Sequence, residues 1–470
     1  MKGIILLAFI YFFTFSAQAK QIEIKGRAEG GAGKTIEVLS YNDPVLLRSR
    51  PIKSIVVSDD DSFSFKLSYD ETGWIKLRYG IYELGLIIEP GGSYYLELPE
   101  YKDLPGSENL IPLVKYRYLH LKLKGEDNLN NRIRMIDSLF FNYASGFTRS
   151  ISLGEPVSDR DSILNIFNRI ELATEDEYSQ RYHKFRKCLL KMIADRGSRF
   201  DASEMEIINN GFYPHMPAYT DLVTQVFNGY LRNLAFEDET KRLRALLNRG
   251  GSYTEISAIL RQDGLILNES LLEFVIIYNL FNEYYNSGFN KSSLEKILLD
   301  ISDHAVNDYN KDLSRTIVER INRLKPGNRP PDFNLPDDKG NVFSLDSLEG
   351  KFTILAFGSS VLYETKKELD VLKSWVKDYE DYLELVVILL DEDYESSLTE
   401  MKSAGYDFIF LDASGRKEIL KDYDIRYIPS FYLLDKQARL IQSPAVFPSE
   451  NLKRSVLILL EKSLIEDIRN

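Results

Sequence analysis

Residues 351–370 read KFTILAFGSSVLYETKKELD, and this stretch decides the fold of the last third of the chain. Phe352–Phe357 is an uninterrupted apolar run, which predicts a core strand. Glu364–Tyr379 follows and is expected to form a helix. Leu385–Leu390 is again fully apolar, as is typical of a strand in a sheet covered on both faces. Residues 351–390 together therefore predict the first half of an α/β sandwich.

The pattern continues to the end of the chain. Alternating strand and helix segments predict the order β-α-β-α-β-α-β-β-α for the whole region. The further segments are helices at Ser396–Ala404, Lys417–Tyr423 and Leu452–Leu464, a strand at Asp407–Leu411, and a hairpin of Ser430–Leu434 with Arg439–Ser443.

Three motifs in this region resemble the thioredoxin superfamily, in its TlpA/ResA and AhpC/TSA-like branch. Pro330–Asn341 is similar to the family's entry motif, AP-x-F-x-L followed by D-x-x-G. Leu345–Phe357 is similar to L-x-x-L-x-G-K and the first core strand. Tyr423–Asp435 is similar to Y-x-V-x-x-I-P-T-x-F-L-I-D. The resemblance covers about residues 326–466, and the order and spacing of the motifs make it specific.

The same resemblance locates a degenerate active site. The family reads F-W-A-S-W-C-G-P-C-R-K-E-M-P, and Phe357–Asp370 matches its length without a gap. The two cysteine positions hold Leu362 and Thr365. Thiol–disulfide exchange needs a thiolate and a second thiol one helical turn away. Neither replacement can supply one, so the family's catalytic residues do not carry over.

A groove is predicted beside these positions. By resemblance, Ile428–Pro429 should form a cis peptide bond opposite the Leu362–Thr365 turn. Tyr363 and Tyr427 would then line a groove that takes an extended protein segment by strand addition. A structural interpretation stays open, in which Pro429 only serves the turn geometry of the sheet.

Other chemistries find little support. Ser359 and Ser360 lack a nearby base, because the four histidines all precede residue 326. Asp391–Asp393 follows a buried strand, and we expect it to be a solvated acidic loop. Neither a metal site nor a cofactor is predicted.

Upstream of this region, the spacing of hydrophobic residues changes along the chain and separates a predicted β-strand region from a predicted helical one. Residues 20–105 alternate in Gln21–Gly26, Ser62–Leu67 and Trp74–Tyr79, which predicts an antiparallel β-sandwich domain. The acidic run Asp59–Asp61 between strands is expected to be a solvated hairpin turn. Residues 106–325 predict an all-helical domain, and a Pro- and Gly-rich linker from Lys325 leads into a domain of residues 326–470.

Within the helical region, three local predictions can be stated. Ser203–Glu206, just after Asp201, is interpreted as a capping box. A helix is expected from Ala218 to Leu231. Cys188, the sole cysteine, falls at core spacing and is expected to be a small buried hydrophobe rather than a reactive thiol.

The N-terminal residues predict that the protein is exported from the cytoplasm. Lys2, an apolar run from Gly3 to Phe15 and Ala17-Gln18-Ala19 have the pattern of a secretory signal over residues 1–19. An uncleaved membrane anchor is the alternative. We expect a mature chain from Lys20 in the periplasm or otherwise exported, without membrane insertion. The net charge of −12 disfavours nucleic acid as a partner.

The leading hypothesis is an exported, redox-inactive thioredoxin-fold protein that acts as a binding or scaffold module for an exported protein or peptide segment. The three-part layout also resembles exported multidomain thioredoxin-like proteins of Gram-negative bacteria. Two alternatives stay open: a divergent thiol–disulfide oxidoreductase or peroxidase-like enzyme, and a structural subunit working through its helical domain.

Overall fold

The structure is a computed structural model that describes residues 20–470 except 42, 47–48, 103–116, 121–127, 157–159, 174–175, 197–200, 238–240, 285, 287, 415, 417, 426 and 470. The predicted signal segment 1–19 lies outside the described residues. The described part of the chain forms two compact units: residues within 20–102, 117–230 and 263–278 make the first, and residues within 231–262 and 279–469 make the second. The domain boundaries expected from the sequence stay a prediction.

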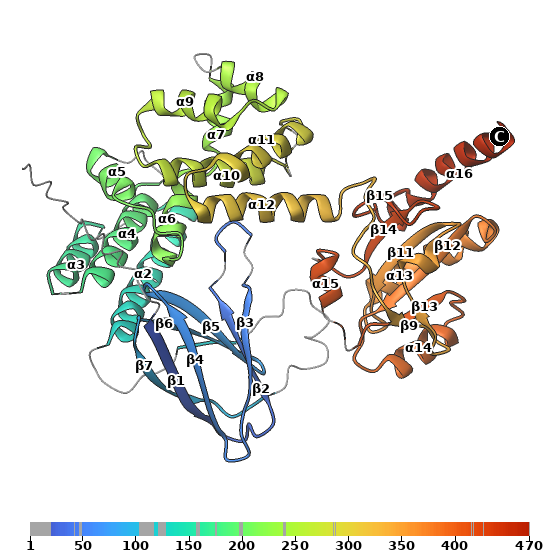
Figure 1. The fold of residues 1–470 in the computed structure, drawn as a ribbon, viewed down its shortest axis with the longest axis horizontal. Coiled ribbons are helices and arrows are strands. Elements are labelled where there is room, and N and C mark those ends of the chain that lie inside the picture. The colour runs from blue at the N-terminus through green and yellow to red at the C-terminus, as the bar shows by residue number, and fades with distance from the viewer. Residues whose placement is uncertain are drawn as a thin grey trace, which may run out of the picture. The chain divides into compact units, whose positions relative to one another are not determined.

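The first unit contains two sheets, which Figure 1 shows one in front of the other. The predicted alternation is confirmed along the first strand, where Ile22 and Ile24 are buried and the residues beside them are exposed or half-buried. One sheet has the order β4-β1-β7 and the other β3-β2-β5-β6-β8. The strands are β1 Lys20–Ala28, β2 Thr35–Ser40, β3 Pro51–Val56, β4 Ser62–Tyr69, β5 Gly73–Tyr79, β6 Tyr82–Ile88, β7 Ser93–Leu98 and β8 Arg117–His120.

Two features of these sheets differ from the sequence prediction. The expectation of antiparallel strands is wrong for β1 and β7, which pair in parallel. In addition, β8 lies in the range expected to be helical and pairs in parallel with β6. Parallel neighbours need long connections, and short-range alternation carries no information about them.

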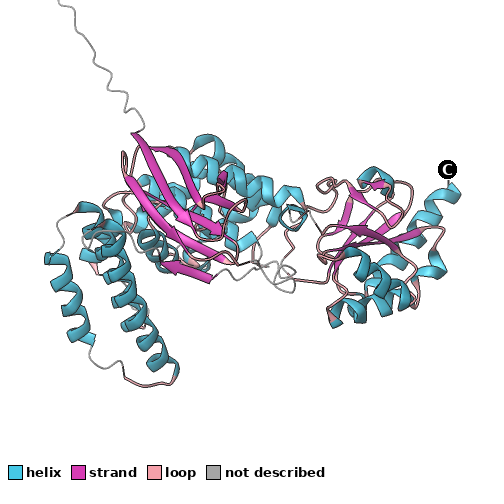
Figure 2. Cartoon of the chain, turned by 90° about the horizontal axis from the view of Figure 1, so that it is seen from below, coloured by secondary structure: helices cyan, strands magenta, loops and turns pink. Residues whose placement is uncertain are grey.

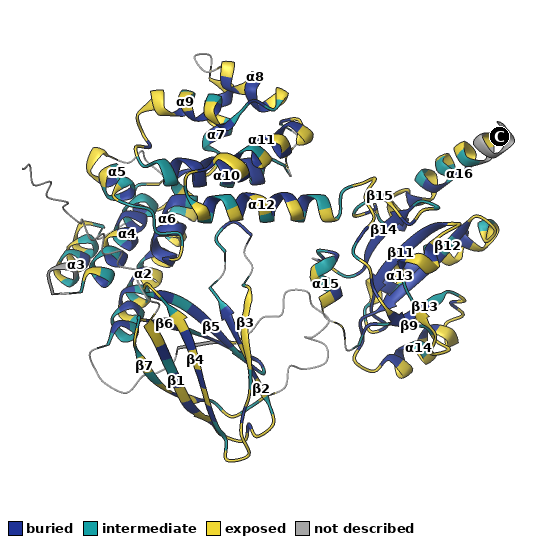
Figure 3. Ribbon diagram, in the orientation of Figure 1, coloured by how far each residue is buried: buried dark blue, intermediate teal, exposed yellow. Residues whose placement is uncertain are grey.

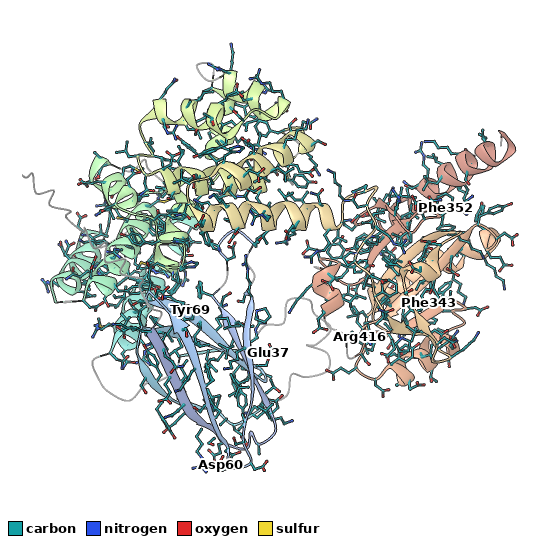
Figure 4. The ribbon with its side chains drawn as sticks, viewed as in Figure 1. Glu37, Asp60, Tyr69, Phe343, Phe352 and Arg416 are labelled. Carbon is teal, nitrogen blue, oxygen red and sulfur yellow. The ribbon has the colours of Figure 1, made fainter. Side chains whose placement is uncertain are left out.

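The acidic turn Asp59–Asp61 links β3 to β4, two strands of different sheets (Figure 4). Asp59 and Asp60 are exposed, as expected. Asp61 is half-buried, adopts a φ of 62°, and accepts hydrogen bonds from the backbone N–H groups of Gly30, Gly31 and Ala32 at 3.1–3.2 Å. The turn thus also fixes the glycine-rich loop between β1 and β2.

Helices complete the first unit (Figure 2). Their centre is Arg186, 2% exposed, whose guanidinium donates to Asp137 and Asp221 at 2.7 Å each. Trp74 of β5 donates to the hydroxyl of Tyr178 at 2.8 Å, which joins the sheet to the helices. The helices are α2 Leu129–Ser152, α3 Arg160–Ala173, α4 Glu177–Ala194, α5 Ala202–Asn209 and α6 Pro217–Val226.

Two local helix predictions need correction. The capping box of α5 is formed by Asp201 and Glu204, not by Ser203 and Glu206, because Asp201 is the residue whose extended backbone precedes the helix. The predicted helix Ala218–Leu231 is interrupted: α6 ends at Val226 and α7 begins at Tyr230, with Gly229 at a φ of 70° between them.

Cys188 is buried, as predicted, and its burial raises the pKa of the thiol to about 12. The thiolate that redox chemistry requires is therefore scarce at neutral pH.

In chain order, the second unit starts with a group of helices that precedes the C-terminal sheet. They are α7 Tyr230–Phe236, α8 Lys241–Arg249, α9 Tyr253–Asp263, α10 Glu269–Tyr284, α11 Lys291–His304 and α12 Asp308–Arg323. The boundary between the units falls within α7, α9 and α10. Ser314 of α12 donates to the Leu298 carbonyl oxygen of α11 at 2.7 Å, which closes a buried helix pair.

The last part of the second unit is a five-stranded sheet of order β13-β12-β11-β14-β15. The first three strands are parallel, and β14 and β15 are each antiparallel to their neighbour. The strands are β11 Phe352–Gly358, β12 Leu383–Leu389, β13 Ile409–Asp412, β14 Ser430–Leu434 and β15 Leu440–Gln442. A small hairpin of β9 Leu335–Pro336 and β10 Val342–Phe343 precedes them in the chain.

Both faces of this sheet are covered, and β11 and β14 are buried at every residue (Figure 3). One face packs against α13 Tyr363–Lys373, α14 Tyr394–Ser403 and α16 Leu452–Arg469, and the other packs against α15 Glu418–Asp422 and the segment around β9. Ile354 and Leu355 are adjacent in β11 and enter opposite cores. The sequence expectation of a single helix Glu364–Tyr379 is wrong at its end, since α13 stops at Lys373 and Val376–Tyr379 is a 3-10 helix.

Candidate functional site

The register of the sheet gathers the predicted site at one edge. Gly358, the last residue of β11, pairs with Leu389 at the end of β12. Phe357 pairs with Ser430 at the start of β14. The loop after β11, the residue after β12 and Pro429 therefore meet at the carboxyl edge of the parallel strands, where α/β sheets place their sites.

Leu362, at the first cysteine position, is the N-cap residue of α13 and is half-exposed. Its side chain offers no acceptor to the N–H groups of the first helical turn. A cysteine sulfur at this place would be the nucleophile of the family chemistry, whereas leucine presents only carbon.

Thr365, at the second position, is 1% exposed. Its hydroxyl oxygen accepts a hydrogen bond from the Ser359 N–H at 3.3 Å. Its methyl group lies so close to Gly358 that a Cβ there would sit 2.7 Å away. Thr365 therefore holds the loop between β11 and α13 as a structural side chain, and Gly358 leaves room for it.

Asp391 corrects a sequence prediction. The run Asp391–Asp393 was expected to be solvated, and this is wrong for Asp391, which is 4% exposed. Its carboxylate accepts from the Ser359 hydroxyl at 2.7 Å and from the Ser360 N–H at 3.0 Å. The reason is position: Asp391 follows β12 at the sheet edge, directly beside the loop that leaves β11.

We refer to Ser359, Ser360, Thr365, Asp391 and Ser397 as the serine cluster. Ser360 Oγ lies 3.0 Å from Ser397 Oγ of α14, so the cluster ties three elements together. All five side chains are at most 5% exposed. Ser359 and Ser360 are therefore shielded from a substrate, in line with the sequence argument against serine catalysis.

The Ile428–Pro429 peptide bond is cis, as predicted. Pro429 is buried and Ile428 is half-buried, while Tyr427 is 46% exposed. Across the loop, Tyr363 is 75% exposed and Val361 is 64% exposed. We refer to Val361, Tyr363 and Tyr427 as the apolar surface. The groove predicted from the sequence stays a prediction.

Phe447 was not considered from the sequence. Its ring centroid lies 5.8 Å from that of Tyr427 and 6.0 Å from that of Phe431. Its loop is held by Glu368, 5% exposed, whose carboxylate accepts from the N–H and the hydroxyl of Ser449 at 2.9 and 2.8 Å. Tyr427 is therefore supported from a segment twenty residues downstream.

One ion pair lies at the start of α13, beside the site. Lys366 on the first turn of α13 pairs with Glu400 of α14, and this hydrogen bond lowers the pKa of the Glu400 carboxyl. Within the described chain, no three His, Cys, Asp or Glu side chains gather as a metal site would require. None of the helices over the described residues has the length and apolar content needed to cross a membrane.

The strand order and the cis-proline loop define a thioredoxin-like domain. Comparison with known proteins agrees, since residues 326–443 match the AhpC/TSA family. This part of the chain is thioredoxin-like, and it is similar to that family and to ResA within it.

Three individual proteins illustrate the similarity. The thioredoxin-like protein YneN of Bacillus subtilis is 26% identical over 126 residues, which cover 27% of this chain and 74% of YneN. The thiol-disulfide oxidoreductase ResA of Bacillus subtilis is 26% identical over 121 residues, which cover 25% of this chain and 66% of ResA. A solved thiol-disulfide oxidoreductase from Bacteroides fragilis is 23% identical with a TM-score of 0.26, covering 29% of this chain and 99% of that one.

The family motifs predicted that Leu362, Thr365, Tyr363, Tyr427, Ile428 and Pro429 lie together. The sequence prediction for Asp391 was wrong, and no role was assigned to Glu368 or Phe447. A signal for Asp391 existed, because it directly follows the apolar run Leu385–Leu390. The signal for Phe447 was weaker, since nothing in a loop sequence says which ring it will meet.

Proposed function

We propose that the chain is an exported protein whose thioredoxin-like domain is redox-inactive and binds an extended segment of another protein. One observation carries the proposal: the two redox positions hold a leucine and a buried threonine, on a site whose fold is otherwise kept. The named relatives include thiol-disulfide oxidoreductases. This chain would retain their scaffold without their sulfur chemistry.

Redox inactivity is tested by dithiothreitol-dependent reduction of insulin, with the chain from Lys20 onward. We expect a rate equal to the buffer background, because Leu362 and Thr365 lack sulfur and Cys188 is buried. The matched control is Cys188→Ser. A rate above background that this variant abolishes would instead favour the divergent oxidoreductase.

The assignment of the two positions is tested by restoring the thiols. Leu362→Cys with Thr365→Cys, in a Cys188→Ser background, should form a disulfide that reductant opens. The two positions are separated by one helical turn at the start of α13. Leu362→Cys alone is the control that cannot close the ring. Absence of the disulfide in a folded double variant would contradict the alignment with the family motif.

Binding is supported by the apolar surface, which leaves two large tyrosine rings exposed beside the cis-proline loop. Backbone groups before such a proline can pair with an extended segment without any sulfur. The test is a pulldown from the exported fraction with Tyr363→Ala plus Tyr427→Ala as the variant. We expect loss of the partners that the unaltered chain retains.

Tyr382→Ala is the matched control for this pulldown. Tyr382 is 42% exposed, similar to Tyr427, but it precedes β12 at the opposite edge of the sheet. If the double variant retains the same partners as this control, the site is not the interface. Attention would then move to the helical region as a structural subunit.

Export is supported by the residue pattern of 1–19. N-terminal sequencing of the native protein should begin at Lys20. An intact Met1 or a cytosolic pool would contradict this part of the proposal.

A further inference from the structure

We propose that the last helix, α16, forms an antiparallel pair with α16 of a second copy of this chain. The starting observation is that this helix is apolar on two opposite faces. Leu452, Val456 and Leu460 are at most 5% exposed and join the core on the sheet. Ile458 and Ile465 are 44% and 51% exposed.

The exposed residues form one stripe. Ile458, Glu461, Lys462 and Ile465 are all exposed, and they follow the spacing i, i+3, i+4, i+7. At about 100° per residue they fall within an arc of about 100°. The buried residues Leu452, Val456 and Leu460 lie on the opposite side of the helix by the same count. The core therefore does not use this stripe, and figures 1 and 3 show α16 reaching beyond the sheet with exposed residues along it.

The order of the four residues along the stripe indicates that its partner is a second copy of the same helix. Ile458 and Ile465 are equally distant from the point between Glu461 and Lys462. A twofold axis through that point places Ile458 against the partner's Ile465 and Glu461 against the partner's Lys462, twice each. A twofold contact must be complementary to itself in this way. A parallel pair would instead place Glu461 against Glu461 and Lys462 against Lys462, which like-charge repulsion disfavours.

The contact is small, so the pair should be weak and depend on concentration. A stable interface buries about 1,200–2,000 Å² in total, and one exposed stripe on a single helix offers less. Apolar burial at the four isoleucines would supply most of the affinity, and the two ion pairs would set the direction. This inference is independent of the function proposed for the site.

The direction is tested by cross-linking in a Cys188→Ser background. An equal mixture of Ile458→Cys and Ile465→Cys chains should give a disulfide-linked dimer under mild oxidation. Either variant alone should give little, because two identical positions would be offset by about 10.5 Å along the axis. A disulfide needs Cα atoms within about 7 Å of each other. Equal linking in the single-variant samples, or none in the mixture, would overturn the proposal.

The charge pattern is tested by sedimentation velocity over a concentration series that reaches about 1 mM, the range of weak association. Glu461→Lys should weaken self-association about fivefold, since both ion pairs become like-charge contacts. Glu461→Lys with Lys462→Glu reverses both charges and should restore it. Circular dichroism checks that each variant folds. A chain that stays monomeric throughout the series contradicts the proposal and leaves the stripe to a different partner.

Discussion

Two acidic runs of the chain look alike in sequence and differ in the structure. Asp59–Asp61 and Asp391–Asp393 each follow a strand, and both were expected to be solvated. In each run one carboxylate holds a neighbouring segment: Asp61 holds the loop Gly30–Ala32, and Asp391 holds the loop Ser359–Ser360. Asp61 remains partly exposed, whereas Asp391 is 4% exposed.

The difference comes from the strands that precede the two runs. Asp59–Asp61 turns between strands of two sheets, so water reaches it from outside. Asp391 lies two residues beyond β12, a parallel strand covered on both faces, and near the end of the neighbouring strand β11. A hydrogen bond lost at the first place can be replaced by water, but one lost at the second leaves a buried group unpaired. The comparison therefore predicts unequal costs for equal substitutions.

The largest effect is expected for Asp391→Ala, at about 3 kcal/mol of unfolding free energy, because the Ser359 hydroxyl and the Ser360 N–H lose their buried acceptor. Denaturation is followed by Trp375, which lies in the core of this domain, in a Trp74→Phe background. The matched control is Glu392→Ala, an exposed neighbour whose substitution should cost less than that of Asp391, because water reaches the position and can replace a lost contact. Equal effects of the two substitutions would refute the contrast.

Asp61→Ala should destabilise the first unit by about 2 kcal/mol, since it removes the acceptor of three N–H groups and puts alanine at a φ of 62°. Asp61→Gly removes the same acceptor without the backbone penalty and should cost about 1 kcal/mol. Trp74 of β5 is the reporter, in a Trp375→Phe background. If Asp61→Gly lowers the unfolding free energy as much as Asp61→Ala does, the positive φ of this residue contributes nothing to the loss.

Asp393→Ala should cost about 1 kcal/mol, because Asp393 caps α14 by accepting from the Ser396 N–H at 3.0 Å. Asp393→Ser retains a capping oxygen and should recover most of the loss. Trp375 fluorescence measures both. An effect as large as that of Asp391→Ala would mean that capping, rather than burial, governs this loop.

The smallest effect concerns pH at Asp60. The Ser62 hydroxyl donates to its carboxylate at 2.6 Å, and this bond lowers the pKa of Asp60 below its ordinary value. A lowered carboxyl pKa stabilises the folded state above the unfolded value of about 3.9 and ceases to do so as the pH falls through the folded value. The advantage of the unaltered chain over Asp60→Asn should therefore shrink between about pH 5 and pH 2. NMR titration of Asp60 checks the direction, and a pKa above that of an unfolded aspartate would contradict it.

The sequence predicted much of the thioredoxin-like domain. The apolar runs of β11 and β12 and the cis-proline loop were identified in advance, as was the absence of sulfur at Leu362 and Thr365. These features depend on local pattern: a strand buried on both faces must be apolar throughout, and an absent thiol is visible in the sequence itself. The predicted export segment belongs to the same kind of inference and awaits its experiment.

Tertiary structure alone decided what lies around those residues. The burial of Asp391, the support of Tyr427 by Phe447 and the parallel pairing of β1 with β7 each join segments that are far apart in the chain. Such contacts depend on which strand ends and loops the fold brings together. The spacing of hydrophobic residues, every two in a strand or every 3.6 in a helix, does not specify these long-range neighbours. An acidic residue after a strand is thus solvated at one sheet edge and buried at another, because its neighbours in space, not in sequence, determine whether water can reach it.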